Sequence, residues 1–182
     1  MAKIQLSQRM YSISDVARLL KSGEMQIQPK YQRRRTAWPL SAKTALIDTI
    51  LSNFPILPIY LRDYKDPSGK RRKEIIDGQQ RISTIREYYN DEFRLSRTIS
   101  DRSLGNCLCS ELPSDQFMTF EDYELPFVSI RGANEADVVS IFTRHLRRTD
   151  VQTTQFLDDR FDSACRYPLD VHFGYSHHQC SF

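Results

Sequence analysis

The order of strand and helix patterns along the chain predicts an α/β domain. Residues 59–64 and 73–77 alternate as β-strands, and the turn residues 66–69 (Asp-Pro-Ser-Gly) lie between them, so we expect a hairpin. Directly after the second strand, apolar residues recur at helical spacing over residues 82–89. The chain has 182 residues, which is long enough for one domain with its own core.

Two helices and a strand are expected before the hairpin. Ser14 is placed to cap a short helix that ends at Gly23, and residues 25–28 alternate as a strand. Pro39 is well placed to begin a longer helix. The residues that should turn this helix toward a core, because they recur at helical spacing, are Leu40, Ile47, Ile50, Leu51 and Phe54.

The pattern weakens after the hairpin and its helix. Residues 93–95 are a candidate for a short strand, and residues 96–120 read as a long polar loop. Residues 124–130 predict a further strand, and Asn134 is placed to cap a helix with an apolar face.

Composition excludes several classes of protein. Hydrophobic residues make up 40% of the chain, and ten Phe, nine Tyr and one Trp argue against wholesale disorder. No apolar run approaches the ~18 residues of a membrane span, and the N-terminus lacks the apolar core of a signal peptide. The four cysteines show no zinc-ligand spacing, so we expect free thiols and a cytoplasmic chain without membrane partners.

Charge is distributed unevenly along the chain. Residues 1–91 hold 17 Lys and Arg against 9 Asp and Glu, a net of +8, whereas residues 92–182 hold 9 against 14, a net of −5. A basic half suggests an anionic partner, which could be a nucleic acid or a ligand that carries phosphate. Ordinary solvated surface is the alternative reading of the same numbers.

The sequence Asp77-Gly78-Gln79-Gln80-Arg81 stands at the junction between the second hairpin strand and its helix. The first N–H groups of a helix have no intrahelical partner, so they favour an anion, and glycine lets the backbone approach a phosphate closely. Arg81 could add a forked contact to phosphate, and Asp77 could hold Mg²⁺ or orient water. Gln79 and Gln80 are candidate catalytic residues together with Asp77, because their amides can orient water. The alternative is a plain strand–turn–helix corner that Asp77 caps.

A second basic segment lies upstream of this junction. Tyr31, Gln32 and Arg33 are followed by Arg34 and Arg35, which could contact DNA phosphates. Trp38, which comes next, is expected to anchor a core rather than to stack on a base, and the basic run over residues 70–73 is expected to be a solvated hairpin flank rather than a DNA contact.

The D-G-Q-Q-R sequence, the upstream Tyr31-Gln32-Arg33 and Trp38 occur in an order that resembles the N-terminal domain of GmrSD-type restriction proteins. This family is related to the ParB/sulfiredoxin fold, so the resemblance implies a small mixed sheet flanked by helices. It covers residues 10–148, and residues 149–182 are expected to form a divergent tail, poorly ordered and without a nuclease motif. The chain therefore looks like a truncated or frame-altered family member that lacks its nuclease domain.

The resemblance also implies a function. Families of this kind handle nucleotides in modification-dependent DNA restriction, so Asp77 to Arg81 are expected to bind a nucleoside triphosphate and, as a candidate Mg²⁺-dependent NTPase, to hydrolyse it. Tyr31, Gln32 and Arg33 would form a second wall of the pocket, and a separate nuclease subunit would be the partner. Sulfiredoxin-like chemistry is not expected, because Gln79 stands where those proteins have cysteine. The alternatives are a non-catalytic module that binds DNA or protein, or an inactive fragment.

Overall fold

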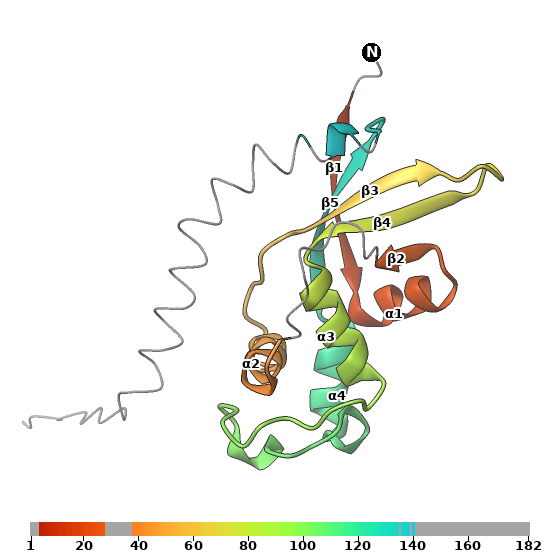
Figure 1. The fold of residues 1–182 in the computed structure, drawn as a ribbon. Coiled ribbons are helices and arrows are strands. Elements are labelled where there is room, and N and C mark those ends of the chain that lie inside the picture. The colour runs from red at the N-terminus through yellow and green to blue at the C-terminus, as the bar shows by residue number, and fades with distance from the viewer. Residues whose placement is uncertain (1–3, 28–37, 135, 139, 141–182) are drawn as a thin grey trace, which may run out of the picture. The chain divides into compact units, whose positions relative to one another are not determined.

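The computed structural model describes residues 4–27, 38–134, 136–138 and 140. The chain divides into two units, residues 1–134 and residues 135–182, and the structure below is that of the first unit. Its five strands are β1 (Gln5–Ser12), β2 (Met25–Ile27), β3 (Ile59–Lys65), β4 (Arg71–Asp77) and β5 (Glu124–Arg131). Its helices are α1 (Ile13–Lys21), α2 (Leu40–Leu51), α3 (Gln79–Tyr89) and α4 (Ser114–Asp122), with short 3₁₀ turns η2 (Arg102–Leu104) and η3 (Cys109–Glu111) (Figure 1).

The strands form one mixed sheet in the order β1-β5-β3-β4-β2. β1 and β3 lie on the two sides of β5, antiparallel and parallel to it respectively. β4 is antiparallel to β3 and parallel to β2. The predicted α/β class, a small mixed sheet with helices, is therefore confirmed. No helix within the described ranges is both long enough and apolar enough to span a membrane.

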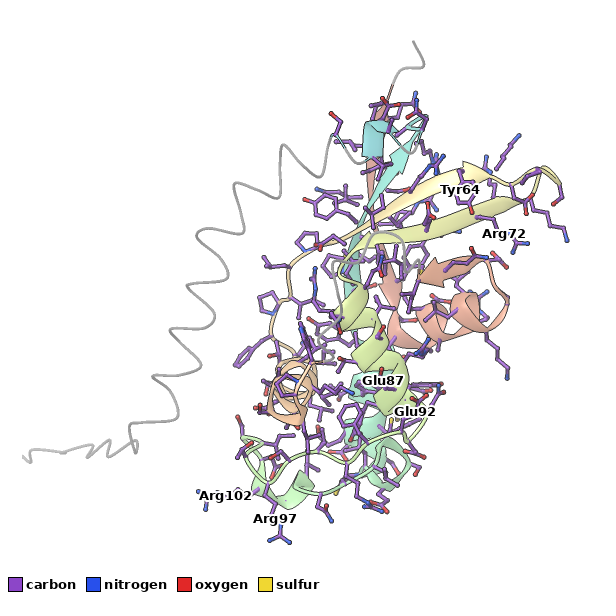
Figure 2. The ribbon with its side chains drawn as sticks, in the orientation of Figure 1. Tyr64, Arg72, Glu87, Glu92, Arg97 and Arg102 are labelled. Atoms are coloured by element: carbon purple, nitrogen blue, oxygen red, sulfur yellow. The ribbon has the colours of Figure 1, made fainter. Side chains whose placement is uncertain are left out.

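The β3–β4 hairpin forms at the predicted turn. Asp66 Oδ1 accepts the backbone N–H groups of Ser68 and Lys70 at 2.9 and 3.0 Å, while Gly69 takes a positive φ of 82°. Arg72 Nε donates to Asp66 Oδ2 at 3.0 Å, and Arg72 Nη1 donates to the Gly23 carbonyl at 2.8 Å. Figure 2 shows Arg72 on β4. This member of the basic run over residues 70–73 therefore has a structural role in the hairpin.

One continuous core joins the helices to the sheet. It includes Ile47 and Ile50 of α2, which are fully buried, as the helical spacing predicts. Leu40 and Phe54, predicted on the same face, are exposed: Leu40 is the first residue of α2, and Phe54 follows the helix, which ends at Leu51. Trp38 is half-buried and packs on this core, so its predicted role as a core contact is confirmed.

The N-cap of the first helix lies two residues before the predicted one. Ser12, not Ser14, is the N-cap of α1, and its hydroxyl accepts the Asp15 N–H at 3.1 Å. Ser14 lies inside the helix and contacts the Ser12 hydroxyl at 2.9 Å. Gly23 follows the end of α1 with a φ of 72°, as predicted.

The segment between α3 and β5 differs most from the sequence-based prediction. Residues 93–95 form no strand, and the expected loop over 96–120 contains the two 3₁₀ turns and most of α4. Phe120 of α4 is fully buried, and its ring meets the Tyr88 ring of α3 edge-on at 5.4 Å. The helix predicted after Asn134 lies largely outside the described residues.

Tyr88 provides a test of this core. Its side chain is fully buried, burial raises its pKa, and its hydroxyl has no hydrogen-bond partner within the described part of the chain. We expect Tyr88→Phe to leave the free energy of unfolding unchanged or to raise it by about 1 kcal/mol, because an unpaired buried hydroxyl is costly. Urea unfolding followed by the fluorescence of the single tryptophan measures the change.

Tyr123→Phe is the matched control for this substitution. The Tyr123 hydroxyl donates to the Phe54 carbonyl at 2.6 Å, so its removal should lower the free energy of unfolding by about 1 kcal/mol. An equal loss in both variants would show that the Tyr88 hydroxyl is stabilising.

Candidate functional site

The candidate site is the corner between β4 and α3, formed by Asp77 to Arg81. Asp77 is the last residue of β4, and Gly78 is the N-cap of α3 with a φ of 81° and a ψ of 14°. A Cβ on Gly78 would lie 2.9 Å from Ile59 Cγ1 and 3.0 Å from Arg81 Nη2. Glycine is therefore required twice, by the left-handed backbone and by the close approach of two side chains.

Arg81 folds back over Gly78 and is bound to the segment that precedes β3. Its Nη1 donates to the Leu57 carbonyl, and its Nη2 donates to the Pro58 carbonyl at 3.2 Å. Nη2 also lies 3.4 Å from Asp77 Oδ2, in an ion pair between residues four positions apart in the chain. Burial lowers the pKa of Arg81, and the negative charge of Asp77 opposes that shift. The guanidinium is thus a partly desolvated cation held by two carbonyls and one carboxylate.

The two glutamines of the corner differ in their surroundings. Gln79 is 5% exposed, and its Nε2 donates to the Ile75 carbonyl of β4 at 2.8 Å. That bond ties the first residue of α3 to the strand before it and gives Gln79 a structural role. Gln80 is half-buried. Of the two amide side chains, that of Gln80 is therefore the more accessible to a ligand.

The start of α3 carries no negative side chain. Its N-cap is glycine, no side chain caps its first turn, and no acidic residue lies there. The first intrahelical bond of the corner runs from the Ile82 N–H to the Gly78 carbonyl at 3.0 Å. The N–H groups of residues 79–81 precede it, and the helix dipole adds a partial positive charge at this end. The corner thus combines oriented donors with a nearby guanidinium.

The structure brings together five of the predicted site residues and leaves the others undescribed. Asp77 to Arg81 meet at one corner, as expected from their adjacency. Tyr31, Gln32, Arg33, Arg34 and Arg35 lie outside the described residues. Sequence reasoning missed the role of Leu57 and Pro58, because it is their backbone carbonyls that bind Arg81 and a carbonyl leaves no trace in residue type.

A preformed metal centre is not found among the residues that the structure describes. No group of three or more His, Cys, Asp or Glu side chains is placed to hold an ion in residues 4–27 and 38–134. Cys109 is buried in the core, and burial raises the pKa of its thiol to about 12, so the thiolate that metals prefer is disfavoured. At the corner itself, Asp77 is the carboxylate available to a cation.

Comparison with known families identifies the chain. The sequence profile of the GmrSD restriction endonuclease N-terminal domain matches residues 16–173. The chain belongs to this family. The match spans most of the 182 residues, so membership of the GmrSD N-terminal family rests on far more than the five residues of the corner.

Comparison with curated sequences gives no match. Comparison with solved structures gives a match to a chain of another protein. This is the C-terminally truncated chromosome-partitioning protein ParB from Caulobacter crescentus, complexed with CTP-gamma-S. The TM-score is 0.38 at 15% sequence identity, and the alignment covers 77% of this chain and 53% of that one. The GmrSD N-terminal domain described here therefore spans about half the length of the ParB chain.

Proposed function

We propose that this GmrSD N-terminal domain binds a nucleoside triphosphate at the β4–α3 corner. The observation that carries the proposal is the convergence of a cation and the first backbone N–H groups of a helix on one glycine. Gly78 permits close approach, the first N–H groups of α3 point outward from the helix, and the guanidinium of Arg81 lies over Gly78. These are the groups that recognise phosphate oxygens in proteins.

Arg81 can serve both the fold and a ligand. Within the part of the chain that the structure describes, Leu57, Pro58 and Asp77 accept three of its N–H groups. A guanidinium has five such donors, so two remain for a phosphate. The three contacts hold the side chain in place before a ligand arrives, which reduces the entropy lost on binding.

Asp77 would bind the Mg²⁺ ion that accompanies the nucleotide phosphates. A single carboxylate is a poor Mg²⁺ site by itself, but Mg²⁺ commonly binds through one or two carboxylates together with substrate phosphates and water. Asp77 fits that pattern only when phosphate is present, which agrees with the lack of a preformed acidic cluster in the described residues. Bound Mg²⁺ would neutralise phosphate charge. Gln80, the more accessible amide, would orient water for hydrolysis.

In a restriction system, this binding would regulate a nuclease that acts on modified DNA. The family supplies the context of restriction, and the corner supplies the ligand chemistry. The contact of residues 34 and 35 with DNA stays a prediction, and so does the partnership with a separate nuclease subunit.

Calorimetric titration with ATP, GTP and CTP, in the presence of Mg²⁺, tests the proposal. We expect one of them to bind, and we expect Arg81→Ala to weaken its affinity about 10–100-fold, since a charge-assisted hydrogen bond contributes about 1.5–3 kcal/mol. The corresponding nucleoside without phosphates should bind far more weakly.

Arg86→Ala is the matched control, because Arg86 is exposed in the last turn of the same helix and makes no contact with the corner residues in the described structure. Arg81→Lys keeps the charge but not the planar guanidinium that contacts Leu57 and Pro58 while it donates to a phosphate, so it should bind better than Arg81→Ala and worse than the unchanged chain. A folded chain that binds none of the three nucleotides would contradict the proposal, as would equal losses in the Arg81 and Arg86 variants.

A further inference from the structure

The two edges of the sheet are protected to different degrees. β1 and β2 are the outer strands, and β2 has three residues whereas β1 has eight. Exposed edges are usually shielded by shortness, charge, proline or a bulge, because their free N–H and C=O groups can pair with another strand. β1 has no proline and one charged residue, Arg9, and it pairs with β5 in unbroken register from Gln5 to Ser12. This edge carries little protection against pairing.

β1 also has an exposed apolar face. Ile4, Leu6 and Met10 alternate along the strand direction, so they share one face, and they are 40%, 67% and 52% exposed. On the opposite face, Ser7 and Tyr11 are half-buried, and the ring of Tyr11 meets that of Phe127 edge-on at 5.3 Å, whereas Gln5 and Arg9 are exposed. Figure 1 shows β1 beside β5. Apolar side chains thus flank a backbone edge that no other strand of the described residues pairs with.

We propose that β1 pairs antiparallel with β1 of a second copy of this chain, with Gln8 opposite Gln8. In that register Leu6 of each copy lies opposite Met10 of the other, which makes two apolar cross-strand pairs on the exposed face. Arg9 lies opposite Ser7, so the two guanidinium groups are kept apart.

The neighbouring registers are less favourable. Centring the pair on Arg9 would place the two Arg9 side chains opposite each other, and like charges in that position are destabilising. Centring it on Ser7 would place Leu6 opposite Gln8 and lose the apolar pair. Of these three registers, the one centred on Gln8 pairs apolar with apolar residues and keeps the charges from direct opposition. This self-complementarity favours a second copy of the chain as the partner at this edge.

The pairing would extend the five-stranded sheet across a two-fold axis into one continuous sheet. The same edge of β1 meets itself across a two-fold axis perpendicular to the sheet, so the Tyr11-bearing faces of both copies lie on one side of that sheet. The corner at Asp77 to Arg81 belongs to β4 and α3, not to this edge strand, so the proposal does not depend on nucleotide binding.

Sedimentation or light scattering over about 1 to 100 μM protein tests the association, in the range where small interfaces dissociate. We expect the chain to dimerise and Met10→Lys to raise the dissociation constant at least tenfold, because each substitution enters the symmetric interface twice. Met118→Lys is the matched control, since Met118 is 61% exposed on α4, away from β1, and it should leave the constant unchanged.

Cysteine pairing tests the register. With Cys107, Cys165 and Cys180 replaced by serine, Leu6→Cys mixed with Met10→Cys should form a covalent dimer on mild oxidation, and each variant alone should not. Directly opposed residues have Cα atoms about 4.5–5.5 Å apart, within disulfide reach. A chain that stays monomeric over the whole concentration range overturns the proposal. So does a dimer that Met10→Lys leaves intact or that cross-links only in another register.

Discussion

Replacing Gly78 with alanine is expected to lower the free energy of unfolding by about 2–5 kcal/mol. An alanine in the left-handed conformation costs about 1–2 kcal/mol, and a clash in a packed region costs about 1–3 kcal/mol more. Both apply here, because Gly78 has a φ of 81° and its new Cβ would lie 2.9 Å from the buried side chain of Ile59.

Gly69→Ala separates the two costs. Gly69 has a φ of 82° in the hairpin turn, but a Cβ there would meet nothing within 4 Å. We therefore expect Gly69→Ala to lose only the backbone cost, about 1–2 kcal/mol. Urea unfolding of both variants, followed by the fluorescence of Trp38, measures the difference. If the two glycines proved equally sensitive, the close packing at Gly78 would have no energetic weight.

Phe120→Ala is expected to lower the free energy of unfolding by about 3–5 kcal/mol, the range for removing a large buried aromatic side chain. Phe120 is fully buried, and its ring contacts those of Tyr88 and Tyr89 at centroid distances of 5.4 and 6.5 Å. The substitution would leave a cavity between α4 and α3, the helix whose first turn forms the candidate site.

Phe54→Ala is the control for this prediction. Phe54 is 62% exposed, so its truncation should change the free energy of unfolding by less than about 1 kcal/mol. Thermal unfolding followed by circular dichroism gives the comparison. A loss in Phe120→Ala no larger than in Phe54→Ala would contradict the placement of α4 against α3.

The elements that the sequence predicts well are those with local chemistry. The β3–β4 hairpin follows from Asp66 and Gly69, whose side-chain bonds and positive φ close the turn without help from elsewhere. The α3 helix follows from Gly78 and from buried Ile82 and Ile85 at helical spacing.

Two elements escaped prediction because their signals are weak. β1 exposes its apolar residues, so its pattern does not mark a buried face. α4 buries only Phe120 fully and exposes Met118, which leaves too few apolar positions to indicate a helix. Both elements are stabilised by segments far away in the chain: β1 pairs with β5, and α4 packs against α3.

The sequence by itself determined the candidate site as a set of residues. Asp77 to Arg81 are adjacent along the chain, and glycine between a strand and a helix has a recognisable chemistry, so their meeting at one corner required no long-range contact. The hairpin, the α3 helix and the α/β class could be predicted from the sequence for the same reason: their signals come from residues that are close together in the chain.

Only the tertiary structure decided which contacts the corner residues make and where β1 lies in the sheet. It binds Arg81 to the carbonyls of Leu57 and Pro58, it commits Gln79 to the Ile75 carbonyl, and it leaves β1 at the edge of the sheet. These outcomes depend on backbone atoms and on strand order, which residue types do not encode. The physical reason is that contacts between segments far apart in the chain form only when the whole core packs.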